Sequence, residues 1–181
     1  SIWFFGSYMM MRNCGNEASV VFWDRFLYIG VIPMPVIIFH LACELTQKIK
    51  DQKYKNLIKI GYIISLIFLF ISRTDFFLKG VFRHAWGCHS VAQIAHHIFL
   101  IPFFSYIFLF LYTFFDCYRN TEDKILKVQS KYVLISFIFL TLSAIEFLPA
   151  YKIGIFPIGY FFVLVWLLIL AYTIVRYQFL N

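Results

Sequence analysis

Charged residues are scarce in this sequence. Only 14% of the 181 residues are charged, whereas 62% are hydrophobic and the mean hydropathy is +0.79. Soluble domains are about a quarter charged and about half apolar, so this composition excludes an ordinary soluble domain. The 24 Phe and 12 Tyr exceed what a small soluble core could hold, but lipid-facing helices and membrane interfaces accommodate them readily. We therefore expect a protein that crosses a membrane several times.

The sequence also lacks the common catalytic signatures. It contains no phosphate-binding glycine loop, no His-Glu-x-x-His, no Gly-x-Ser-x-Gly and no paired catalytic carboxylates, so we expect no enzyme activity in this chain. There is no Cys-x-x-Cys motif and no signal peptide with a cleavage site. The chain begins at Ser1 inside an apolar run and stops soon after its last hydrophobic segment, so we expect a longer parent protein.

Long uncharged runs define the predicted spans. Residues 155–175 form 21 positions without a charge, or about 31 Å of helix, which matches a hydrocarbon core of about 30 Å. The predicted spans are residues 20–46, 57–77, 94–118, 132–148 and 155–175, after a partial helix over residues 1–11. Pro33 and Pro35 should kink the first complete span. The predicted fold is all-α: one polytopic membrane helix bundle with five complete spans, and no output domain.

The basic residues indicate an orientation. A net charge of +7 would suit nucleic-acid binding in a soluble protein, but here the basic residues lie in short connections between spans, so we predict no nucleic-acid partner. Residues 47–59, residues 119–131 and the C-terminus carry ten of the sixteen Lys and Arg. Lys and Arg favour the cytoplasmic side, which predicts a cytoplasmic C-terminus. The connection over residues 73–93, rich in Phe, Trp and basic residues, should lie at the outer interface.

Three stretches carry a resemblance to a known family. They are Phe22-Trp23-Asp24-Arg25-Phe26-Leu27-Tyr28-Ile29-Gly30 with Ile32-Pro33, Phe39-His40 and Leu45-Thr46; Phe77 to Val81 with Trp86-Gly87; and Phe156-Pro157-Ile158-Gly159 with the run from Ala171 to Tyr177. In that order they resemble the third helix, the outer connection between helices four and five, and the seventh helix of one membrane module. That module is the N-terminal seven-helix region of bacterial sensor histidine kinases and related signalling proteins.

The resemblance covers nearly the whole chain and implies a function. It places residues 2–11 at the end of helix two and the five complete spans at helices three to seven. Cytoplasmic output domains, such as paired kinase units, follow this module, which implies a homodimer. The expected function is a sensory input module of the bacterial cytoplasmic membrane. It would pass a small-molecule or membrane stimulus through the last helix and past Arg176 and Tyr177. The alternative is a small transporter or channel, or a membrane-complex subunit.

Ionisable residues near the outer ends of the spans are candidates for a ligand pocket, because such residues are costly in a membrane. With three neighbours, the candidates are Glu17, Trp23, Asp24, Arg25, Arg73, Asp75 and Glu146. We favour a simpler interpretation, in which each charge reaches the interface or makes one structural ion pair.

The histidines offer only a weak metal site. His84, His89, His96 and His97 lie in or beside the outer connection, and imidazole is a common metal ligand. We favour ordinary interfacial residues and predict no cofactor. Haem is disfavoured because His40 would lie roughly 20 Å in depth from His96 and His97. Retinal is excluded because residues 155–175 contain no lysine for a Schiff base.

Two cysteines are predicted on the outer side, where a disulfide could form. Cys14 and Cys88 share that side, but two outer cysteines need not come within the 4.4–6.8 Å Cα separation that a disulfide requires. We therefore expect free, packed thiols, as we do for Cys43 and Cys117 near the inner ends of their spans.

Overall fold

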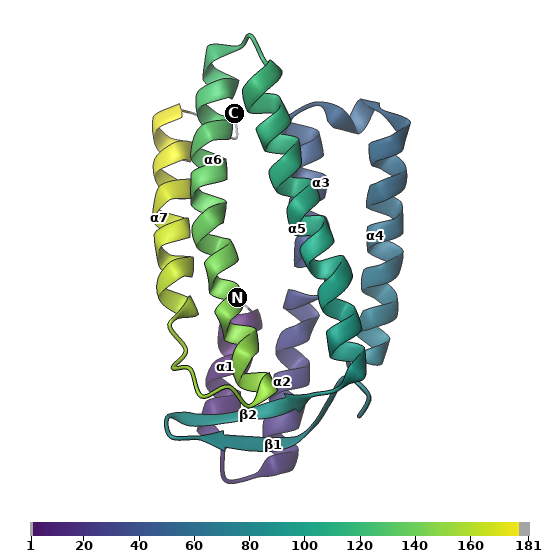
Figure 1. The fold of residues 1–181 in the computed structure, drawn as a ribbon, viewed down its shortest axis with the longest axis vertical. Coiled ribbons are helices and arrows are strands. Elements are labelled where there is room, and N and C mark those ends of the chain that lie inside the picture. The colour runs from purple at the N-terminus through teal and green to yellow at the C-terminus, as the bar shows by residue number, and fades with distance from the viewer. Residues whose placement is uncertain (1, 178–181) are drawn as a thin grey trace.

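The structure is a computed structural model that describes residues 2–177. Long helices run roughly along one axis, and one small two-stranded sheet closes one end (Figure 1). Five described segments are long and apolar enough to cross a membrane: Glu17–Leu45, Gln52–Ile71, Ile94–Asn120, Lys124–Tyr151 and Gly159–Arg176. The predicted all-α membrane bundle is therefore confirmed.

The first half of the bundle is a helical hairpin followed by a broken helix. Helix α1 (Ile2–Arg12) packs antiparallel against α2 (Glu17–Val31), and Asn16 caps α2 by accepting from the Ser19 N–H at 3.2 Å. Helix α2 stops at Val31 and α3 (Met34–Leu45) begins after Pro33. The predicted proline kink is thus confirmed. Pro35 lies in the first turn of α3, where its missing N–H leaves no intrahelical bond unmade.

Three spans begin earlier than the sequence predicted, and the shift is largest for the second and the fourth. After the short 3₁₀ helix η1 (Lys48–Lys50), α4 covers Gln52–Ile71, and after α5 (Ile94–Asn120), α6 covers Lys124–Leu142. Asp51 and Asp123 cap α4 and α6 through their side chains. Four lysines that the sequence places in loops therefore lie in the first turns of these helices: Lys53, Lys55, Lys124 and Lys127. Their long side chains can keep the charge in the headgroup region.

The connection over residues 73–93 contains a β-hairpin, which the sequence pattern does not indicate. Strand β1 (Leu78–His84) pairs antiparallel with β2 (Gly87–Ala92), with Leu78 opposite Ala92 and His84 opposite Gly87. A bulge interrupts the register after Leu78, and Gly80 there has φ +68°, which glycine adopts without strain.

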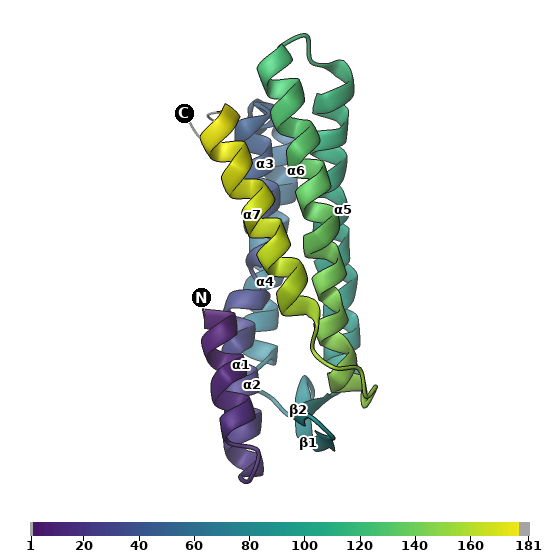
Figure 2. The same cartoon turned by 90° about the vertical axis from the view of Figure 1, so that its left-hand side faces the viewer.

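The last elements are η2 (Ser143–Tyr151) and α7 (Gly159–Tyr177), which packs along α6 (Figure 2). The α3–α4 connection, the α5–α6 turn and the end of α7 lie at one end of the bundle, here called the loop end. The β-hairpin, the α1–α2 turn and η2 lie at the other, the hairpin end (Figure 1). The three predicted inner connections therefore share one end. Arg176, predicted to begin the signal exit with Tyr177, is exposed at the loop end, and residues 178–181 lie outside the described part.

Candidate ligand-binding site at the hairpin end

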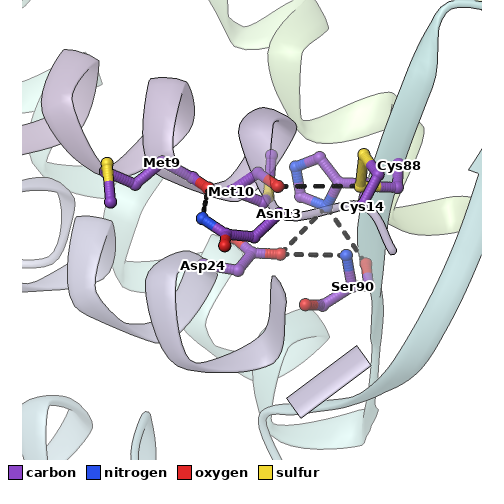
Figure 3. The surroundings of a disulfide bond; sticks show 8 residues. Met9, Met10, Asn13, Cys14, Asp24, Cys88 and Ser90 are labelled. Carbon is purple, nitrogen blue, oxygen red and sulfur yellow. Dashed lines mark hydrogen bonds and ion pairs between the residues drawn. A yellow bond between two sulfur atoms is a disulfide. The ribbon is translucent and has the colours of Figure 1, made fainter. Parts of the chain in front are cut away.

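A disulfide fastens the β-hairpin to the α1–α2 turn. Cys14 and Cys88 are bonded, with their Cα atoms 5.6 Å apart (Figure 3). The prediction of free thiols at these positions is wrong. The prediction failed because it did not include the hairpin, which folds β2 back against the end of α1 and buries Cys88 beside Met10. Cys43 and Cys117 are free and buried, as expected.

The same strand forms a buried polar network with Asp24 of α2. The Asp24 side chain is fully buried, and its Oδ2 accepts from the Ser90 N–H at 3.0 Å (Figure 3). His89 Nδ1 lies 3.1 Å from the same oxygen and 3.1 Å from the Ser90 carbonyl oxygen. Burial lowers the pKa of His89, but the Asp24 carboxylate and the Ser90 carbonyl outweigh it, so the pKa is raised above its ordinary value. Asp24 Oδ1 and Ser90 Oγ have no hydrogen-bond partner among the described residues.

Arg25, the next residue on α2, makes a separate polar cluster. Its guanidinium donates to Asp75 Oδ1 at 2.8 Å, to the Arg73 carbonyl at 2.9 Å and to the Leu78 carbonyl at 2.7 Å. The hydrogen bond from Arg25 lowers the pKa of Asp75, and Lys79, 3.7 Å away, adds to this shift. Burial lowers the pKa of Arg73, and the like charge of Arg25 lowers it further. This cluster attaches the entry of the hairpin to α2.

The seven predicted pocket residues therefore do not meet in one place. An open cleft of about 500 Å³ is lined by Glu17, Arg25, Arg73 and Asp75. Asp24 faces the hairpin strand β2 instead, because adjacent residues on a helix point about 100° apart. Trp23 packs its ring against aromatic residues of α1 and α2, namely Phe5, Phe22 and Phe26. Glu146 lies in η2 and lines a second, larger cavity.

Two further polar contacts hold η2 in place. His96, fully buried in α5, joins the Tyr28 hydroxyl at 2.6 Å and the Tyr151 hydroxyl at 2.7 Å. One hydroxyl donates to the imidazole and the other accepts from it, so both ring nitrogens are satisfied. Glu146 Oε1 accepts from the Gly159 N–H at 2.6 Å, at the first residue of α7. A carboxylate is well placed there, because the N-terminus of a helix attracts negative charge.

The larger cavity has a volume of about 630 Å³. Its walls come from α1, α2, α3, α5, α6, η2, the β-hairpin and α7, and most lining side chains are apolar. This volume falls in the range of roughly 300–1,000 Å³ that is typical of small-molecule sites. The polar exceptions include Trp86 and His89 from the hairpin, Glu146 from η2, and Tyr160 and Trp166 from α7. The cavity therefore joins the hairpin directly to the last helix.

The four candidate histidines are engaged in separate contacts. His84 stacks on Trp86 at a centroid distance of 4.8 Å and lies 3.2 Å from the Pro149 carbonyl. His97 Nδ1 lies 2.9 Å from the Gln93 carbonyl. His89 and His96 belong to the networks described above. Within residues 2–177, no group of three or more His, Cys, Asp and Glu side chains is placed to hold a metal ion.

Comparison with protein-family models, with curated protein sequences and with solved structures finds no match to this chain. The resemblance to sensor kinases therefore stays a prediction. The long apolar helices themselves indicate that the chain is a membrane protein.

Proposed function

We propose that this chain is a membrane-embedded sensory input module of a bacterial signal-transduction protein. A molecule in the 630 Å³ cavity would contact the hairpin and α7 at the same time. Occupancy would change how α7 sits against the bundle, and the end of α7 would carry that change to cytoplasmic output domains. The shared wall between the hairpin and α7 is the observation that supports this proposal.

The packing of α7 suits a helix that moves. Apart from η2, which precedes it, α7 packs mainly on α6, and Val163 is its only buried hydrophobic residue among those described. By contrast, α2 is fastened by the Asp24 network, the Arg25 cluster and the neighbouring disulfide. Displacing α7 therefore disrupts fewer contacts than displacing α2. A ligand can shift such an equilibrium only through a difference in affinity between the two positions.

The proposed location is the bacterial cytoplasmic membrane, with the loop end inside. The denser Lys and Arg of the loop-end connections support this orientation. The disulfide at the hairpin end supports it independently, because disulfides persist in oxidising compartments and are rare in the cytosol. The parent chain would work as a homodimer with paired kinase units, as the family resemblance implies.

The test is a spin-label distance between α3 and α7. Labels at Leu41 and Val175, both exposed towards the loop end, report the position of α7 in lipid nanodiscs. The buried thiols Cys43 and Cys117 are first replaced by alanine, so that labelling is specific.

A substitution that fills the cavity imitates occupancy. Ala144 lines the cavity, and Ala144→Trp should shift the mean distance by about 2 Å or more, the scale of helix shifts in switching proteins. The matched control is Ile138→Trp on the exposed face of α6, which should leave the distance unchanged. If both variants keep the wild-type distance, the cavity is not coupled to α7 and the sensory proposal is refuted.

A further inference from the structure

Three polar groups around the cavity can form hydrogen bonds with a ligand. The indole nitrogens of Trp86 and Trp166 are buried and have no hydrogen-bond partner within the described residues. His89 uses Nδ1 for Asp24 and Ser90, which leaves Nε2 for the cavity that His89 lines. We infer that the cavity binds a neutral lipophilic molecule that carries carbonyl-type oxygens, such as a ketone, an ester or a quinone. This inference rests on the proposed sensory cavity and names its class of ligand.

The two indoles are donors without acceptors. An indole N–H can only donate, and a buried donor left unpaired destabilises the protein. An oxygen on a ligand would remove that cost at both residues. Trp166 lies seven residues beyond Gly159, so its donor is about 10 Å deeper in the bundle than the start of α7. Trp86 lies at the hairpin tip, with its ring 6.2 Å from that of Phe156. The ligand therefore meets donors at two depths.

The contacts of His89 indicate how its ring faces the cavity. Both neighbours of Nδ1 are oxygen acceptors, so Nδ1 carries a proton in either charge state. Nε2 therefore donates to a ligand oxygen when the ring is charged and accepts a hydrogen bond when it is neutral. Asp24 fixes this arrangement, although it does not line the cavity itself.

The charges nearby argue for a neutral head group. Glu146 lines this end of the cavity, Asp24 lies directly behind His89, and His89 is the one base among the described lining residues. An anionic head group would therefore meet an excess of acidic groups. A cationic head group could stack on the indole rings, but it would leave both buried indole N–H groups without an acceptor, and Glu146 already accepts from the Gly159 N–H. A carbonyl oxygen accepts hydrogen bonds without bringing a charge.

The walls and volume of the cavity favour a ligand that is mostly apolar and of moderate size. At about 30 Å³ for each water-sized group, 630 Å³ holds roughly twenty such groups. Most wall residues are apolar, including Trp3, Leu27, Phe103 and Val163. A molecule of this kind partitions into the bilayer and could reach the cavity from the hydrocarbon core.

The test uses a fully substituted benzoquinone with a decyl chain as the probe. Quinones quench tryptophan fluorescence, so binding to the chain in nanodiscs should appear as saturable quenching. Trp86→Phe and Trp166→Phe keep a ring and remove the donor, and each should weaken binding about five- to tenfold. Trp23→Phe is the matched control, because Trp23 lies on α2 away from the cavity, and it should leave the affinity unchanged.

Competition identifies the head group. Dodecan-2-one should displace the quinone, whereas dodecanoate and dodecane should do so at least tenfold less well. Stronger displacement by dodecanoate, or quenching that never saturates, would overturn the inference. The sensory proposal would then still be tested separately by the spin-label distance between α3 and α7. If the quinone binds as expected but Ala144→Trp leaves α7 in place, the ligand class stands and the sensory function fails.

Discussion

Removing the Cys14–Cys88 disulfide should destabilise the protein and loosen the hairpin first. The two cysteines are 74 residues apart, so the bond closes a long loop in the unfolded chain. On the loop-entropy model, a closure of this length stabilises the native state by about 4 kcal/mol. The double variant with Cys14→Ala and Cys88→Ala should therefore lose a large part of the stability of the bundle.

The loss should also be local, and trypsin can detect it. Lys79 and Arg83 are exposed on β1, where Arg83 pairs with Cys88 and Lys79 lies in the bulge between the paired residues Leu78 and Val81. Without the bond, β2 is attached to α1 only by noncovalent contacts, so the strands should open more often and both sites should be cut faster. Cleavage is followed by mass spectrometry on protein in nanodiscs, alongside thermal unfolding.

A matched control separates the bond from the loss of a thiol. Cys117→Ala removes a buried free cysteine of α5 and should leave hairpin cleavage at the wild-type rate. Equal cleavage in the double variant and the wild type, with unfolding temperatures that agree, would refute the idea that the disulfide holds the hairpin.

Three further predictions concern packing and charge. Asp24→Ala should destabilise the protein by about 3 kcal/mol, because it leaves the Ser90 N–H unpaired and removes the carboxylate beside His89 in a buried site. Asp24→Asn keeps an acceptor and should cost less in the same thermal unfolding assay. The raised pKa of His89 predicts a stabilising contribution that is complete below pH 6.5 and is lost as the pH rises through the raised value. The unfolding temperature of the wild type should therefore fall above pH 6.5 more steeply than that of His89→Gln, and parallel curves would contradict this. Gly61→Ala should destabilise the protein by about 2 kcal/mol in thermal unfolding, since its Cβ would clash with Val36 Cγ2 and lie 2.7 Å from Tyr106 Cζ, and this crowding exceeds the gain of about 1 kcal/mol in helix propensity. An unchanged or higher unfolding temperature would show that Val36 and Tyr106 can shift at little cost.

The spans were predictable because hydrophobicity and length act locally. An uncharged run such as residues 155–175 needs no knowledge of its neighbours to be assigned to a membrane. The helix starts were less predictable. Lysines after Asp51 and Asp123 look like loop residues, whereas the aspartates are the caps that begin the helices. A capping signal was therefore available in the sequence and was outweighed by the charge pattern.

The site was only partly predictable, because its contacts join distant segments. The sequence marks Asp24 as a costly ionisable residue within a span, but its burial depends on His89 and Ser90, which lie more than 60 residues away in an unpredicted strand. Helical geometry alone could have separated Asp24 from Arg25, because consecutive residues face different directions. No local pattern identifies Trp166 as a cavity residue, since a tryptophan in a membrane span can face lipid equally well.

The disulfide also constrains the order in which the chain is assembled. Between Cys14 and Cys88 lie α2, α3 and α4, so two complete spans must be inserted before both thiols reach the same side. In the proposed orientation, the bond can form once the hairpin has been translocated. It does not require α5, α6 or α7. The native bond therefore indicates that the spans in the first half of the protein were inserted correctly. A nascent chain in which α4 failed to insert would leave Cys88 in the reducing compartment, and its free thiols would distinguish it from correctly built molecules.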